Sequence, residues 1–191
     1  MKIYKYAILF VFLASLAFQA QAQDNISPER KAAIDSLALE KVRDLGKYIS
    51  IIGNKATEYS EAKRVIDRAQ ELFMEGSVME VSSLYRKKVN TYKIKEYLER
   101  LMRLNYQKVN ITWFKIQYVS DLVKQPDGRY VGVITIYQRF EGETKEGFKY
   151  VDTTKKDITI YVERKSTQID GIPVGFWDVL LGDIRVKETT K

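Results

Sequence analysis

The fold is decided by the stretch from Tyr106 to Glu141, which reads YQKVNITWFKIQYVSDLVKQPDGRYVGVITIYQRFE. Its first part, Tyr106–Leu122, is rich in the β-branched and aromatic residues that favour strands. Residues 125–128, QPDG, have the composition of a turn, and Arg129–Glu141 is again extended. We therefore predict two long antiparallel strands joined by a tight turn.

The first of these strands changes phase near its middle. Apolar side chains alternate from Val109 to Trp113, and the alternation then continues in the opposite phase from Phe114 to Leu122. A slip of one residue is typical of a β-bulge, which bends the strand and curves its sheet. The sequence thus predicts a bulge at Trp113-Phe114.

The N-terminus has the pattern of an export signal. Lys2 and Lys5 precede an apolar run, Ala7–Phe18, and Ala20-Gln21-Ala22 offers small residues for cleavage. We predict a signal peptide over residues 1–22 and one domain over residues 23–191, in a periplasmic or extracellular location. No later stretch approaches the roughly 20 apolar residues of a membrane-spanning helix, so we expect no membrane span.

The composition excludes several kinds of chemistry. The chain has no histidine and no cysteine, which removes the commonest general base, Ser-His and Cys-His nucleophiles and most zinc sites. The net charge of +7 is spread along the chain rather than gathered on one face with aromatic residues. We expect no metal, no cofactor and no nucleic-acid partner.

Three helices are predicted before the long strands. The first begins at Ser27-Pro28-Glu29 and ends at Gly53, and the second covers Ala62–Phe73. A short strand, Val78–Tyr85, comes next. The third helix is capped by Asn90 or Thr91 and carries its apolar stripe over 94–102.

The remaining strands follow the central pair. Even-numbered apolar residues from Phe148 to Val162 indicate either one strand that crosses a solvated polar stretch, residues 152–157, or two short strands. A last strand is expected over Phe176–Lys187, with a second bulge at Gly182. The segment between them, Lys165–Val174, is expected to be a loop.

This order of elements resembles the nuclear transport factor 2-like superfamily. The resemblance covers Pro28–Glu188, and the segments Val131–Phe140 and Trp177–Ile184 look like inner strands of that fold. It implies an α+β single domain in which N-terminal helices pack on a strongly curved antiparallel sheet, forming a cone with an apolar pocket.

Catalytic branches of that superfamily resemble ketosteroid isomerase, which places a carboxylate beside tyrosine donors inside the cone. The candidate aspartates lie at strand ends or at the more polar set of alternating strand positions, so we expect them on exposed surface. The alternative function is a small carboxylate/tyrosine lyase or isomerase. Its candidate residues are Asp121, Asp152, Asp157, Asp178 and Asp183, with Tyr118, Tyr137 or Tyr161.

We favour a non-catalytic binding or assembly module of the bacterial cell envelope. Tyrosines on the predicted strands can pack apolar surface while keeping hydroxyls at a wet edge. The other explanation for these tyrosines is that they pack in the core. The partner is an envelope protein, a glycan or a small apolar ligand. The candidate ligand-binding residues are Trp113, Tyr118, Tyr137 and Trp177.

The return strand is apolar on both faces, which favours a homodimer. Ile134 and Ile136 lie in one phase, and Val131, Val133 and Tyr137 lie in the other. The second face could be covered by a second copy of the chain or by the loop over 165–174, or its apolar residues could be exposed to solvent. With a four-residue turn, Ile116 and Tyr118 would share a face with Val133 and Tyr137.

Overall fold

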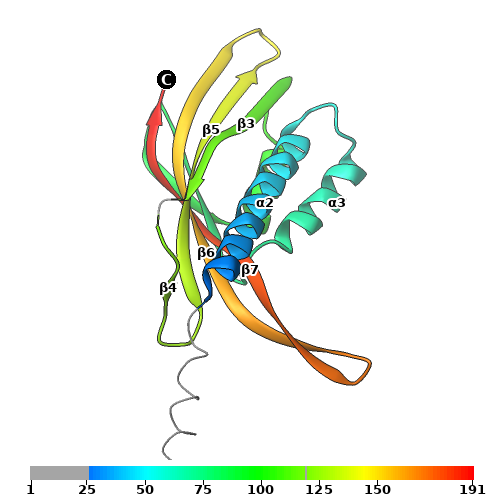
Figure 1. Ribbon diagram of the computed structural model, residues 1–191. Helices are drawn as coiled ribbons and strands as arrows, with labels where there is room; N and C mark the ends of the chain where they lie inside the picture. The colour runs from blue at the N-terminus through cyan, green and yellow to red at the C-terminus, as the bar shows by residue number, and fades with distance from the viewer. Residues whose placement is uncertain (1–25, 119) are drawn as a thin grey trace, which may run out of the picture. The chain divides into compact units, whose positions relative to one another are not determined.

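The computed structural model describes residues 26–118 and 120–191, without the side chains of Arg86, Lys87 and Tyr118. The predicted signal peptide, residues 1–22, lies outside the described residues. By compactness the chain divides into Met1–Ala33 and Ile34–Lys191. The second unit holds every strand of the described chain (Figure 1).

The seven strands of the described chain form one mixed sheet in the order β2-β1-β7-β6-β5-β3, with β4 paired to β5. The predicted α+β class is therefore confirmed, but the prediction of a wholly antiparallel sheet is wrong, since β1 and β7 run parallel with Met79 opposite Ile184. The strands are β1 (Val78–Ser83), β2 (Arg86–Lys93), β3 (Lys108–Tyr118), β4 (Val123–Lys124), β5 (Tyr130–Glu143), β6 (Lys149–Ile169) and β7 (Ile172–Thr190).

The parallel pairing begins before β1. Met74 N–H donates to the Leu181 carbonyl at 2.7 Å, and Leu181 N–H donates to the Leu72 carbonyl at 2.8 Å. Phe73 forms a parallel bridge with Leu181. The chain thus runs parallel to β7 at Phe73, before β1 begins, and in the same direction at Met79 within β1.

Three helices are present among the described residues: α2 (Pro28–Gly53), α3 (Tyr59–Gln70) and α4 (Ile94–Met102). The predicted start of α2 is confirmed, with Arg30 N–H donating to Ser27 Oγ at 3.3 Å. Its apolar face is buried at Ile34, Ala38, Val42, Leu45, Ile49 and Ile52. No described helix combines the length and the apolar character needed to cross a membrane.

The predicted cap of the third helix is wrong. Asn90 and Thr91 lie in β2, paired with Val81 and Glu80, and α4 follows Lys93, whose side chain makes no capping hydrogen bond. The sequence RKKVNTYK is too polar to predict a strand from periodicity. It forms a strand through antiparallel pairing with β1, in which Asn90–Lys93 pair with Val78–Val81 and Arg86 pairs with Ser83 across a register shift.

Both predicted bulges exist. In β3, Phe114 pairs with Tyr137 and Gln117 with Thr135, which places the extra residue at 115–116. This is one to two positions later than predicted, at Lys115, whose φ of 49° is left-handed. The bulge also makes Tyr118 pair with Ile134, so the predicted grouping of Tyr118 with Val133 is wrong.

The second bulge is in β7. Ile158 pairs with Ile184 and Ile160 with Leu181, so the extra residue lies at Gly182-Asp183, as predicted. The predicted turn over 125–128 is confirmed too, with Gly128 N–H donating to the Gln125 carbonyl at 3.0 Å.

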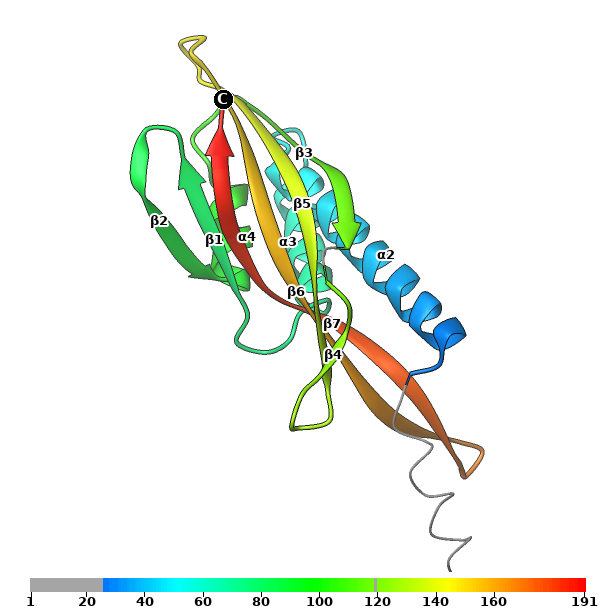
Figure 2. The same cartoon turned by 60° about the vertical axis from the view of Figure 1, so that its left-hand side comes forward.

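The predicted loop Lys165–Val174 is wrong. It is the end of a continuous β6–β7 hairpin closed by Asp170 and Gly171, whose φ values are 51° and 79°. Two residues with positive φ give a turn that matches the twist of paired strands. Figures 1 and 2 show this end extending past the rest of the sheet.

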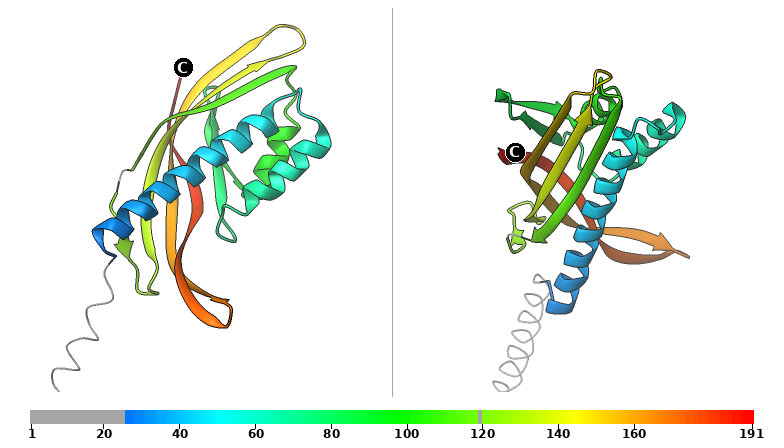
Figure 3. Two further views of the ribbon diagram at one scale, coloured as in Figure 1. Left: turned by 45° about the vertical axis from the view of Figure 1, so that its right-hand side comes forward. Right: turned by 90° about the horizontal axis from the view of Figure 1, so that it is seen from above.

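The core lies on the face of the sheet that carries the even-numbered residues of β5 and β6, here called the inner face. From Ile34 onward, α2 crosses this face (Figure 3). A β-carbon on Gly46 would lie 3.4 Å from the Trp113 ring, so the helix approaches β3 closely. Residues with no exposed surface on the inner face include Met79, Ile134, Ile136, Ile158, Ile160, Val162, Val179, Leu181 and Ile184.

Candidate functional site

A cavity of about 530 Å³ lies on the inner face, among the β1–β2 hairpin, α4 and the ends of β5 and β6. Figure 2 shows the β1–β2 hairpin with α4 behind it. Most of the lining side chains are aromatic or polar. Those used below are Tyr85, Lys88, Tyr92, Tyr97, Arg100, Tyr106, Gln138, Phe140, Tyr150, Asp152, Thr154 and Lys156.

One wall of the cavity is a continuous row of four aromatic rings. Tyr106 and Phe140 have centroids 5.6 Å apart, Phe140 and Tyr150 5.9 Å, and Tyr150 and Tyr85 5.6 Å. Room for this row depends on Gly142 in β5, where a β-carbon would lie 2.7 Å from the Tyr106 ring. Neighbouring rings are tilted by 57–64°, so the row offers apolar ring faces and edges with phenolic hydroxyls at intervals.

Tyr150 and Asp152 form a fixed polar pair in this wall. The Tyr150 hydroxyl donates to Asp152 Oδ2 at 2.5 Å, accepts from Leu84 N–H at 3.0 Å and lies 3.1 Å from Ser83 Oγ. Asp152 is only 4% exposed. Burial raises the pKa of Asp152, although the hydrogen bond from Tyr150 and the charge of Lys156 oppose the shift.

Lys156 is buried deeper on the same face, with 2% of its surface exposed. Its Nζ donates to the Glu80 carbonyl at 3.0 Å, and it lies 3.5 Å from Met79 Sδ and 5.9 Å from the Tyr97 ring centroid. Burial lowers the pKa of Lys156 to about 8, and the charges of Asp152 and Glu80 limit the fall.

Strand β6 brings these groups together by simple alternation. Asp152, Thr154 and Lys156 are 4%, 3% and 2% exposed, and they continue the phase of Ile158. The prediction of a solvated stretch over 152–157 is therefore wrong, and the one-strand alternative is correct. The polar row is buried because the β1–β2 hairpin and α4 cover this end of the sheet.

The opposite wall comes from β2 and α4. The Arg100 guanidinium lies 4.5 Å from the Tyr92 ring centroid, and Tyr97 is buried beside Lys156. Burial raises the pKa of the Tyr97 hydroxyl. Among the described side chains, three basic ones line the cavity, Lys88, Arg100 and Lys156, and one acidic one, Asp152.

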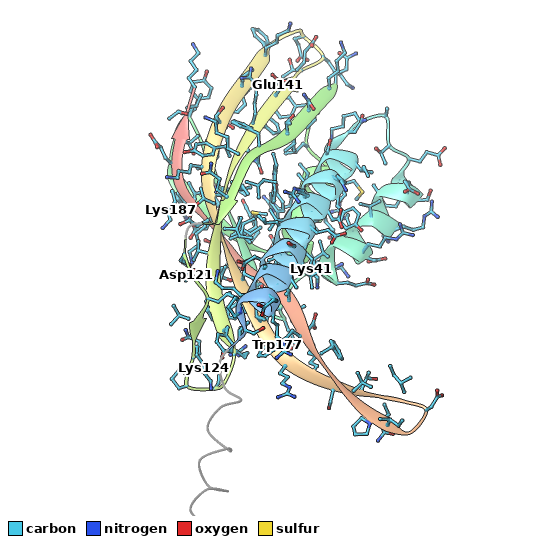
Figure 4. All side chains as sticks on the ribbon, in the orientation of Figure 1. Lys41, Asp121, Lys124, Glu141, Trp177 and Lys187 are labelled. Carbon is cyan, nitrogen blue, oxygen red and sulfur yellow. The ribbon has the colours of Figure 1, made fainter. Side chains whose placement is uncertain are left out.

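The four predicted ligand-binding residues are not brought together. Trp113 donates its indole N–H to Gln138 Oε1 at 3.1 Å and reaches the cavity only through that amide. Tyr137 packs on Phe114 on the outer face, with centroids 5.8 Å apart. Trp177 packs on Tyr130 at 5.7 Å, near the base of the β6–β7 hairpin (Figure 4). The Tyr118 side chain lies outside the described residues.

Of the five candidate aspartates, only Asp152 lines the cavity. Asp157, on the outer face, accepts from Thr135 Oγ1 at 2.6 Å, and Asp183 accepts from Val78 N–H at 3.1 Å. Asp121 is exposed between β3 and β4 (Figure 4).

Asp178 is held by two lysines. Its carboxylate lies 2.7 Å from Lys165 Nζ and 3.6 Å from Lys41 Nζ; Figure 4 shows Lys41 on α2. Burial alone would raise the pKa of Asp178, but the hydrogen bond from Lys165 and the two positive charges lower it. Its surroundings are those of a structural ion pair.

Sequence reasoning missed Lys156 and the aromatic row. The available signal was the even-numbered phase shared by Tyr150, Asp152, Lys156 and Ile158. Nothing local marks Tyr106, Phe140 and Tyr85 as neighbours, because they come from different parts of the chain.

No protein-family model, no curated protein and no solved structure matches the chain. Its chemistry must therefore be inferred from the cavity itself. Within residues 26–118 and 120–191, no three acidic side chains are grouped to hold a metal ion. The arrangement can stack a flat molecule on one ring of the aromatic row and engage its polar groups with Asp152, Tyr150 and Lys156.

Proposed function

We propose that the protein is an exported, non-catalytic binding or assembly module that holds a small ligand in the inner-face cavity. The main observation in support of this proposal is a cavity of about 530 Å³ with a four-ring aromatic wall and fixed polar groups. Ligand sites typically have about 300–1,000 Å³, mostly apolar linings and a few well-placed polar groups.

The lining favours a flat aromatic or unsaturated ligand that carries an anionic group. The rings of the row are tilted to one another, and such a molecule can stack on the face of one ring and meet the edge of the next. The described lining has three basic side chains and one acidic side chain, which favours a negative charge on the ligand. Arg100 is half of a cation–π pair with Tyr92, and its guanidinium matches a carboxylate in shape.

The wider setting of this proposal comes from the sequence. A cone-like arrangement of the nuclear transport factor 2-like type is supported by the order of elements and by the two bulges. A periplasmic or extracellular location is supported by the N-terminal pattern over residues 1–22. A homodimer through the sheet is supported by half-buried apolar residues on the outer face, namely Val131, Val133, Tyr137 and Leu180.

Naphthoate, an aromatic carboxylate, is a suitable probe for this site. We expect amide chemical shifts in NMR spectra to change around Phe140, Tyr150 and Thr154 as naphthoate is added. Shifts confined to the outer face, around Val133 and Tyr137, would contradict the proposed site.

The carboxylate/tyrosine enzyme remains a second candidate because Asp152 is buried and hydrogen-bonded to Tyr150 at 2.5 Å. Such a pair can abstract a proton from carbon and return it to another position. Isomerisation of a β,γ-unsaturated ketone, followed by ultraviolet absorbance, tests this directly. Turnover lost in Asp152→Asn and kept in Asp157→Asn would favour the enzyme, whereas no turnover by the wild type would remove it.

A further inference from the structure

Lys156 stands apart from the other lysines of the described chain by its burial. It is 2% exposed, yet it lines the cavity that the proposed function assigns to a ligand. Every other described lysine is half-buried or exposed. A buried ammonium must be compensated, or it gives up its proton.

The compensation around Lys156 is incomplete. An ammonium has three donors, and Nζ has one oxygen acceptor, the Glu80 carbonyl at 3.0 Å, together with Met79 Sδ at 3.5 Å. Among the described residues, no carboxylate forms an ion pair with it. The Glu80 carboxylate accepts from Val186 N–H at 2.8 Å and lies 3.7 Å from Arg185. Asp152 is then the acid that shares the cavity with Lys156.

We propose that Lys156 is the reactive amine of a carbonyl-binding site, which captures an aldehyde or ketone group of a small ligand as a protonated imine. This inference rests on the proposed function, because it requires a ligand in the cavity. It adds the functional group by which the ligand is held: a carbonyl on a flat aromatic or unsaturated body.

The chemistry uses groups already present. The lone pair of neutral Nζ attacks the carbonyl carbon, and the carbonyl oxygen takes up a proton to give a carbinolamine. Loss of water then leaves the imine. Overall, one carbonyl compound, one amine and one proton give one iminium ion and one water. Asp152 stabilises the positive charge that forms, since it already interacts electrostatically with Lys156.

The local electrostatics support this role. With a pKa of about 8, Lys156 has on the order of 100-fold more neutral amine at neutral pH than an exposed lysine of ordinary pKa. A purely structural lysine, tying β6 to β1 through the Glu80 carbonyl, would need only its charge and its hydrogen bond. Arginine can supply both, but it forms no stable imine under these conditions.

The test is reductive trapping of the full mature protein with naphthaldehyde and cyanoborohydride at neutral pH, followed by peptide mass mapping. Lys155 is the matched control, because it is the neighbouring lysine on the outer face of the same strand. We expect Lys156 to be labelled at least about tenfold faster than Lys155, because Lys156 alone of the two lines the cavity in which the aldehyde is held. Lys156→Arg, checked for folding by circular dichroism, should lose this label, and Lys155→Arg should keep it.

Naphthoate, which cannot form an imine, separates the two proposals. Binding of naphthoate without preferential labelling of Lys156 would overturn the carbonyl site and leave the binding function standing. If naphthoate does not bind and Lys156 is not labelled, both proposals fail. Since the labelling is measured on the wild type, these outcomes remain decisive even if Lys156→Arg does not fold.

Discussion

The Tyr150 hydroxyl donates a 2.5 Å hydrogen bond to Asp152, two residues further along β6 and on the same buried face. The same hydroxyl accepts from Leu84 N–H at 3.0 Å, between β1 and β2. One tyrosine thus links the carboxylate of the cavity to the hairpin that covers it. This link explains how an acid only 4% exposed is tolerated at this end of the sheet.

Asp152→Asn should change the acid dependence of stability. Because the folded-state pKa of Asp152 is raised above 3.8, the folded chain takes up the proton before the unfolded chain as the pH falls. In that window acidification favours the folded state of the wild type. Asparagine does not titrate. As the pH falls through this window, the free energy of unfolding of the wild type should therefore rise relative to that of Asp152→Asn. Urea unfolding over a pH series measures this, and a relative stability that falls would contradict the assignment.

Comparison with Lys156→Met should show that the stability of the wild type rises with pH under alkaline conditions. Between pH 8 and 10.5, the unfolded chain keeps the Lys156 proton while the folded chain has released it. Raising the pH through this window therefore stabilises the wild type relative to Lys156→Met, by on the order of 3 kcal/mol. Urea unfolding of both proteins across this range tests the prediction. A difference in stability that stays flat would show that Lys156 is charged when folded.

The alternation of side chains could be predicted, but the pairing of distant segments could not. The two bulges were visible as phase changes, because a one-residue slip moves every later side chain to the other face. The polar stretch from Asp152 to Lys156 was misjudged since its burial depends on β2, whose sequence has no strand pattern. The aromatic row likewise depends on Gly142, which makes room for Tyr106 from another element.

Gly182→Ala should destabilise the protein. A β-carbon at this bulge would lie 2.4 Å from Cε2 of Tyr161, so the ring or the strand must move, at a cost of about 1–3 kcal/mol. Gly175→Ala in the same strand is the control, because its nearest neighbour is the Arg164 side chain at 3.5 Å. Adding Tyr161→Ala should recover part of the loss. Equal unfolding midpoints for the two alanine variants would refute this packing.

The outer face should mediate self-association if the proposed homodimer forms. Val133→Lys places a charge among the half-buried residues Val131, Tyr137 and Leu180, and should shift a dimer to monomer. Sedimentation of the protein over a concentration series measures this. Thr167→Lys, on the exposed end of the β6–β7 hairpin, is the control. A monomeric wild type across the series would exclude the dimer.

The central claim, that the inner-face cavity binds a small ligand, is tested most directly by calorimetric titration of naphthoate into three proteins. Thr154→Met fills the cavity from β6, whereas Thr153→Met makes the same change one residue away on the outer face. We predict that the wild type and Thr153→Met bind one equivalent with similar affinity, and that Thr154→Met binds at least about tenfold more weakly, a loss of about 1.4 kcal/mol. Equal affinity of the two methionine variants would contradict the claim.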